Sequence, residues 1–149
     1  MLLREADRTA VRKHFEDLAG PVSATLYSQQ ESSLVVPGRT PCPTCPTAEA
    51  LLREVGELSD RLTVKVRDVD EAPDAARDAG ITRLPAIELT GVAKGRVRLL
   101  GLPDGHEFGS LIAAATWVSG APLTLSEDAT QQLSELRRPL HVKVFTTPT

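Results

Sequence analysis

The chain has 149 residues, of which 41% are hydrophobic and only 3% aromatic, so aliphatic side chains must fill the core of the globular protein that we expect. Its net charge of −3 argues against nucleic acid as a main partner, and no run of about 18 apolar residues predicts a membrane span. The first residues carry charges too early for a secretory signal, and we therefore expect a cytoplasmic protein without membrane association.

Hydrophobic periodicity and turn residues divide the chain into short helices and strands. Apolar residues three or four apart predict helices, whereas alternation and β-branched residues predict strands. In chain order, we predict a helix over 4–18, a strand over 22–27, a loop over 28–41, a helix from the cysteine pair at 42 and 45 to 59, a strand over 62–70, a helix over 71–79, strands over 85–89 and 96–100, a helix over 106–118, a helix from 126 and a strand over 139–146.

This order of elements predicts an α/β fold with a central mixed sheet flanked by helices. The connections after the strands over 22–27 and 62–70 are long enough for parallel pairing. The turn-rich residues 90–95 predict an antiparallel hairpin between the next two strands, which the helix over 106–118 would cover.

The two ends of the chain are alike. Glu16–Ser28 aligns with Ser134–Thr146, and each copy is the end of a helix, a proline and an alternating strand. We therefore expect one complete unit over 1–121 and the truncated start of a second unit over 122–149. The unpaired strand edge over 139–146 predicts a homodimer, because such an edge tends to pair with another chain.

The two cysteines of the chain, Cys42 and Cys45, form a C-x-x-C pair at the predicted start of a helix. With Cys42 as the N-cap, Pro43 takes the first helical position and the Cys42 thiolate lies at the positive end of the helix dipole. Such a setting lowers a thiol pKa from about 8.5 to about 7 or less. The pattern predicts thiol–disulfide exchange, in which Cys42 attacks a disulfide and Cys45 resolves the mixed disulfide.

Other interpretations of the cysteine pair stay open. A C-x-x-C supplies two of the four ligands of a zinc site, but the three histidines, His14, His106 and His141, lack the usual ligand spacing. Two ordinary buried thiols are a further alternative. A docking module of the same fold with an inactive pair is the alternative function. We predict no metal and no cofactor.

Leu84 and Pro85 precede a predicted strand. A proline in the first position of a strand gives up one hydrogen-bond donor. A cis Leu84–Pro85 bond would bring the preceding loop close to the cysteine pair and leave backbone groups free to hold an extended substrate.

These residues carry a resemblance to a known family. Cys42-Pro43-Thr44-Cys45-Pro46, followed by helix, strand, helix and Leu84-Pro85 before a hairpin, resembles the thioredoxin fold. The whole chain, and Gly101–Gly120 above all, is similar to the N-terminal half of the glutaredoxin-like protein disulfide oxidoreductases. It is also similar to the N-terminal domain of the flavoprotein component of alkyl hydroperoxide reductase.

The resemblance implies a redox-active Cys42–Cys45 disulfide with Cys42 as nucleophile, a cis Pro85, and a role in cell redox homeostasis. It implies protein disulfides as substrates, positioned by Leu84, Pro85 and the residues Pro43 and Thr44 between the cysteines, and a thioredoxin-reductase-type flavoprotein as electron donor. The segment from Gln29 to Thr40 departs from the family pattern as an insertion. The second active site is absent, which puts isomerase activity in doubt.

Overall fold

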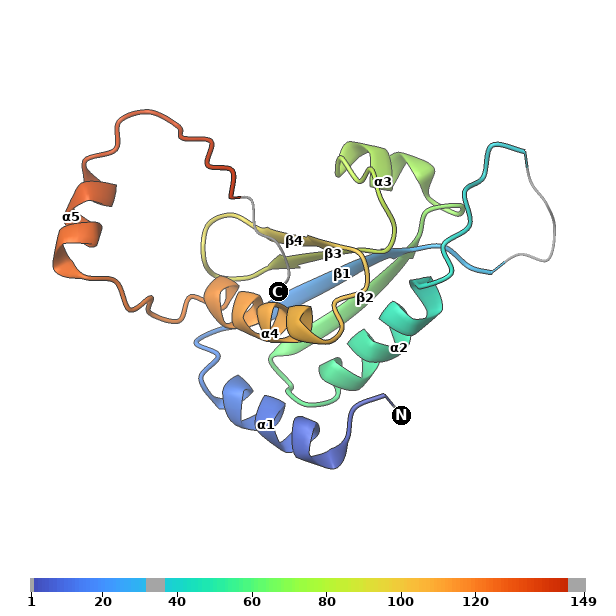
Figure 1. Cartoon of the computed structure of the whole chain (residues 1–149), viewed down its shortest axis with the longest axis horizontal. Helices are drawn as coiled ribbons and strands as arrows, with labels where there is room; N and C mark the ends of the chain where they lie inside the picture. Colours follow the sequence, from blue (N-terminus) through green and yellow to red (C-terminus); the bar gives the residue numbers. More distant parts are fainter. Residues whose placement is uncertain (1, 32–36, 145–149) are drawn as a thin grey trace.

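The structure is a computed structural model that describes residues 2–31 and 37–144. Its elements form a mixed four-stranded sheet with helices on both faces, followed by a C-terminal helix that lies to one side (Figure 1). In the described ranges the elements are α1 (Glu5–Glu16), β1 (Val22–Ser28), α2 (Cys45–Gly56), β2 (Leu62–Asp68), α3 (Pro73–Asp78), β3 (Ala86–Thr90), β4 (Val97–Leu100), α4 (His106–Val118) and α5 (Glu127–Ser134).

The sheet has the strand order β2-β1-β3-β4, which confirms the predicted mixed sheet. β1 runs parallel to β2, with Leu26 opposite Val66, and antiparallel to β3, with Leu26 opposite Ile87. β3 and β4 form the predicted hairpin. Because β1 and β2 are parallel, α2 enters the layer at the end of β1 and returns the chain to the start of β2.

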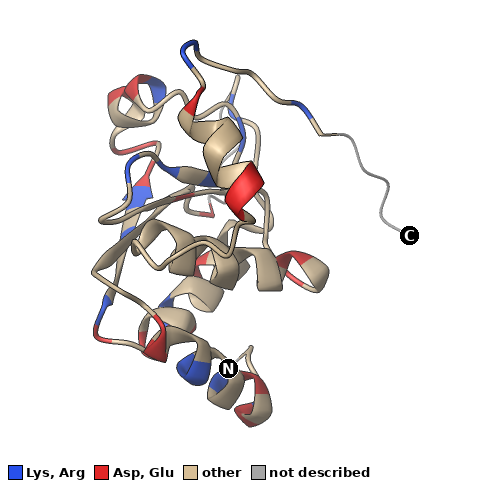
Figure 2. Cartoon of the chain, turned by 90° about the vertical axis from the view of Figure 1, so that its left-hand side faces the viewer, with Lys and Arg blue, Asp and Glu red and all other residues tan. Residues whose placement is uncertain are grey.

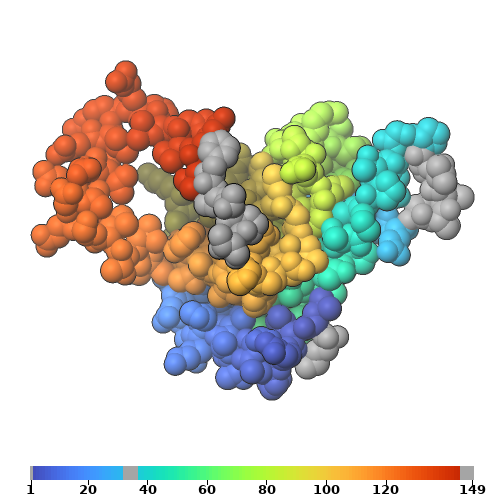
Figure 3. Space-filling model, viewed as in Figure 1, coloured from blue at the N-terminus to red at the C-terminus, as the bar shows by residue number. Residues whose placement is uncertain are grey.

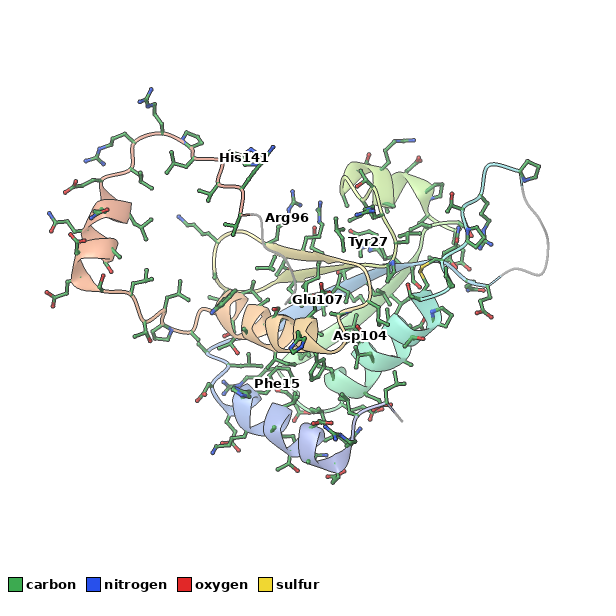
Figure 4. All side chains as sticks on the ribbon, viewed as in Figure 1. Phe15, Tyr27, Arg96, Asp104, Glu107 and His141 are labelled. Carbon is green, nitrogen blue, oxygen red and sulfur yellow. A yellow bond between two sulfur atoms is a disulfide. The ribbon has the colours of Figure 1, made fainter. Side chains whose placement is uncertain are left out.

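The main core lies between the sheet and the helices α1, α2 and α4. Alternate residues of the central strands point to this face, and Leu26 and Ile87 there are fully buried. Phe15 points from α1 toward α4 (Figure 4) and belongs to the same cluster. This layer fixes α2, and with it the cysteine pair, against the sheet.

The opposite face of the sheet carries a smaller cluster at the carboxyl end of β1. Tyr27 and its cross-strand partner Ala86 pack there with Ala76 of α3. Leu84 packs against the same cluster, so the residues before β3 are anchored by α3. The two clusters together hold the start of α2 and the start of β3 at one end of the sheet.

The start of α2 corrects the sequence prediction. The helix begins at Cys45 with Thr44 as N-cap, and not at Cys42. The cause is Pro46, which has no N–H. An N-cap at Cys42 would place Pro46 where its N–H is needed for the first helical bond, whereas a start at Cys45 places it in the first turn, where no bond is lost.

The C-terminal segment corrects a second prediction. Ser126 caps α5 as predicted, since its hydroxyl accepts a hydrogen bond from the Ala129 N–H at 3.2 Å. The predicted strand is not formed over 139–144, and residues 145 and 146 lie outside the described part. A strand needs a neighbour for its backbone groups, and no described strand pairs with this segment.

Residues 122–144 form a lobe beside the body of the molecule (Figure 3), and α5 buries none of its residues. Their assignment to a second unit stays a prediction. The homodimer was predicted from a strand edge over 139–146. No strand forms over 139–144, so the structure gives this prediction no support. Trp117, near the end of α4, is 53% exposed and is not part of the core.

Basic and acidic residues are interspersed along the ribbon in Figure 2, and the first turn of α5 carries Glu127 and Asp128. Within residues 2–31 and 37–144, no helix is long and apolar enough to cross a membrane.

Candidate functional site

The cysteine pair lies where the chain enters α2. Cys42 and Cys45 are joined by a disulfide, with their α-carbons 5.4 Å apart, and the sulfur–sulfur bond is visible at the start of α2 in Figure 4. The Cys45 N–H donates to the Cys42 carbonyl oxygen at 3.2 Å, which closes a tight turn over Pro43 and Thr44. That turn brings the two sulfurs together.

The two cysteines differ in exposure. Cys45 is completely buried and is the first residue of the helix, whereas Cys42 is half-buried and Pro43 and Thr44 are exposed. This asymmetry matches the predicted difference between an accessible cysteine and a sheltered one. An approaching thiol or disulfide can reach only the Cys42 sulfur without moving the helix.

Cys42 lies on the wall of a groove of about 750 Å³. Val69, Ile81 and Leu84 contribute apolar side chains to its lining, and Gln29, Arg39 and Asp70 contribute polar ones. The lining residues are Gln29, Pro37, Gly38, Arg39, Thr40, Pro41, Cys42, Val69, Asp70, Ala76, Ile81, Thr82, Arg83 and Leu84.

Leu84 and Pro85 lie immediately before β3. The Leu84–Pro85 peptide bond is cis. Leu84 lines the groove together with Cys42, while Pro85 is buried behind it and accepts a hydrogen bond from the Gly101 N–H at 2.8 Å. Of the substrate-positioning residues predicted, the structure therefore brings Leu84 to the Cys42 groove. Pro85, Pro43 and Thr44 are not among its lining residues.

A polar network on the groove wall escaped the sequence analysis. The Arg39 guanidinium donates to the Asp70 carboxylate from Nε at 2.9 Å and from Nη2 at 2.7 Å. The amide of Gln29 donates to the other oxygen of Asp70 at 3.2 Å. Arg39 first, and Gln29 second, lower the pKa of the Asp70 carboxyl below its ordinary value, because both donate hydrogen bonds to the charged form.

The sequence offered only one hint of this network, the polar insertion from Gln29 to Thr40 before the cysteines. The residues that pair lie far apart in the chain, so no local pattern shows them. No group of three or more His, Cys, Asp or Glu side chains suited to a metal ion occurs in the described ranges.

No protein-family model matches the chain. The chain is 29% identical over 133 residues to the alkyl hydroperoxide reductase protein AhpF of Escherichia coli (strain K12). That match covers 87% of this chain and 20% of the relative, so the chain spans about a fifth of the length of that protein.

Two solved structures resemble the fold over 91% of the chain, each with 20% sequence identity. One is the alkylhydroperoxide reductase protein AhpF of Enterococcus faecalis (V583), a C503A mutant, with a TM-score of 0.74 and 62% of that structure covered. The other is a protein disulfide oxidoreductase from Aeropyrum pernix, with a TM-score of 0.70 and 56% covered. The chain therefore has a thioredoxin-like fold and, as its sequence indicates, is similar to the alkyl hydroperoxide reductase protein AhpF and to a protein disulfide oxidoreductase.

Proposed function

We propose that this chain is a dithiol oxidoreductase whose reduced Cys42 and Cys45 thiols exchange with disulfides of other proteins, which leaves the Cys42–Cys45 disulfide. The observation that carries the proposal is the unequal burial of two bonded cysteines, of which the more exposed one, Cys42, lines a groove. The similarity to a protein disulfide oxidoreductase supports it. A structural disulfide needs neither an accessible sulfur nor a groove beside it.

The proposed reduction of a substrate proceeds in two exchanges. The Cys42 thiolate attacks one sulfur of the substrate disulfide, which forms a mixed disulfide and releases the other substrate sulfur as a thiolate. The Cys45 thiolate then attacks the Cys42 sulfur and releases the second substrate thiolate. The protein ends with the Cys42–Cys45 disulfide, oxidised by two electrons, and the substrate is reduced by two.

The surroundings of the cysteines favour the thiolate form that this reaction needs. The turn over residues 42–45 places both sulfurs at the N-terminal end of α2, where the partial positive charge of the helix stabilises an anion. The first turn of α2 contains no acidic residue that would cancel this charge. Leu84 lines the same groove as Cys42, and we assign Leu84 and Pro85 to holding the substrate backbone.

The oxidised protein needs a dithiol donor to begin another cycle. We infer a flavoprotein reductase of the thioredoxin-reductase type, because the similar curated protein is named as part of a reductase and is about five times longer than the matched region. The proposed setting is the cytoplasm, where dithiol catalysts are kept reduced. Purified reductase with its nicotinamide donor should reduce Cys42–Cys45, and absence of that transfer would remove the donor assignment.

Reduction of insulin by dithiothreitol tests the main proposal. The parent protein should accelerate precipitation of the insulin chains, and Cys42→Ser should abolish the acceleration. Ser110→Ala is the matched control, because Ser110 is exposed on α4 and does not line the groove. A Cys42→Ser protein as active as the parent would favour the docking module.

A further inference from the structure

A single guanidinium ties together the two ends of the segment that leads to the cysteines. Arg39 Nη2 donates to the Gln30 carbonyl oxygen at 2.5 Å. This hydrogen bond links Gln30, just after the end of β1, to Arg39, just before Cys42. The same guanidinium forms an ion pair with Asp70, which lies just beyond the end of β2. The Arg39 side chain is only 15% exposed, although arginine is usually a surface residue.

Further hydrogen bonds fix the partners of Arg39. The Asp68 carboxylate accepts from the Gln30 N–H at 3.2 Å and from the Asp70 N–H at 2.8 Å. The buried Gln29 amide holds the second oxygen of Asp70. Three stretches of chain, at 29–30, at 39 and at 68–70, are thereby joined. We call Arg39, Asp70 and Gln29 the clamp.

The clamp is connected to Cys42 by a stiff piece of chain. Only Thr40 and Pro41 separate Arg39 from Cys42. Pro41 has a fixed φ angle, and Thr40 and Cys42 each precede a proline, which restricts their backbones to extended conformations. A displacement of Arg39 is therefore passed to the Cys42 backbone with little loss.

We propose that Arg39, held by Asp70, is a positioning residue that fixes Cys42 and the polar wall of the groove for an incoming disulfide. This inference rests on the proposed function and deepens it. Arg39 has no hydrogen bond to either cysteine in the described part of the chain, so it acts through the backbone of residues 39–42. Preorganisation of this kind lowers the entropy lost when an extended substrate binds.

The test combines Arg39→Ala, Asp70→Ala, the double variant and Arg39→Lys. With insulin as substrate, each alanine variant should raise KM roughly tenfold, which corresponds to about 1.4 kcal/mol of binding, and leave kcat within about twofold. The double variant should be no worse than either single one, because the two residues act as a pair. Arg39→Lys should recover only part of the loss, since an ammonium cannot make the bridged contacts of a guanidinium.

Arg77→Ala is the matched control. The Arg77 and Asp74 side chains of α3 are both exposed and pair at 2.8 Å, and Arg77 does not line the groove. Its removal should leave KM unchanged. Thermal unfolding of every variant identifies a temperature at which all of them are folded, and the kinetics are compared there.

A second measurement does not depend on catalysis. The reduced proteins are alkylated with iodoacetamide and with a bulky maleimide, and the two rates at Cys42 are compared by mass spectrometry. Loss of the clamp should open the groove wall and raise the relative rate of the bulky reagent several-fold. Inactivity of the parent toward insulin would contradict the proposed function. The alkylation ratio would still show whether Arg39 positions Cys42. Folded alanine variants with an unchanged alkylation ratio and unchanged KM would overturn it.

Discussion

Replacing Cys45 with serine should stop the proposed reaction at the mixed disulfide. Cys42 is half-buried at the groove, so its sulfur still attacks a substrate in the variant. Cys45 is completely buried and its α-carbon is 5.4 Å from that of Cys42, so in the parent it is always beside the mixed disulfide that it must resolve. Without it, release depends on an external thiol.

The size of the effect follows from this proximity. Well-oriented groups within one molecule react as though present at about 10⁵ M or more, far above the concentration of any added thiol. The lifetime of the mixed disulfide should therefore grow at least about a thousandfold in Cys45→Ser. A serine hydroxyl at this buried position also costs about 1–3 kcal/mol of stability if it finds no partner, and Cys45→Ala avoids that cost.

The assay mixes each reduced variant with a protein that contains one accessible disulfide, and follows the covalent complex by non-reducing electrophoresis and intact mass. Cys45→Ser and Cys45→Ala should both accumulate the complex, and Cys42→Ser should not. Accumulation in Cys42→Ser and not in the Cys45 variants would refute the assigned roles. A folded Cys45→Ala protein that forms no complex would refute the exchange reaction itself.

Three further changes test the fold and the groove. A β-carbon on Gly91 would lie 2.2 Å from the carbonyl oxygen of the last residue of α4. Gly91→Ala should therefore lower the free energy of unfolding in urea by about 1–3 kcal/mol. Gly109 lies within α4 with open space around its α-carbon, so Gly109→Ala should raise that free energy by up to about 1 kcal/mol. The pKa of Asp70 is lowered mainly by Arg39, so their contact stabilises the fold above about pH 4. This contribution to the free energy of unfolding is lost when acid protonates the Asp70 carboxylate. Asp70→Asn should therefore make the free energy of unfolding depend less on pH below about pH 4. Arg83 lines the groove without an ion pair to any described residue. Arg83→Glu should slow exchange with a peptide disulfide flanked by glutamates and speed exchange with one flanked by lysines. Equal exchange rates for both peptides, in the parent and in the variant, would contradict this expectation.

The sequence predicted the layers of the fold because they depend on local patterns. Alternation in β1 and the apolar stripe of α2 each report one buried face, and the turn-rich residues between β3 and β4 report a hairpin. The alternating residues 139–144 follow the same rule and fail. Their pattern gives a strand propensity, but a strand forms only beside another strand, and the described chain provides none.

The candidate site could be predicted only in part. The spacing of Cys42 and Cys45 and their order at the start of the helix were enough to assign an accessible and a sheltered cysteine. The helix start was misplaced because the prediction weighed Pro43 as a first helical residue and gave too little weight to Pro46. The contact between Arg39 and Asp70 joins residues 31 positions apart, and only the parallel pairing of β1 and β2 brings them together.

A redox titration of the Cys42–Cys45 pair against glutathione, read by alkylation and mass spectrometry, tests the central claim most directly. We expect a reversible two-electron midpoint between about −180 and −270 mV, the range of working exchange catalysts. The position within that range would then distinguish a reductase from an oxidase. A midpoint below about −300 mV, or no intramolecular disulfide in the oxidised protein, would contradict the account and favour a structural or metal-binding pair.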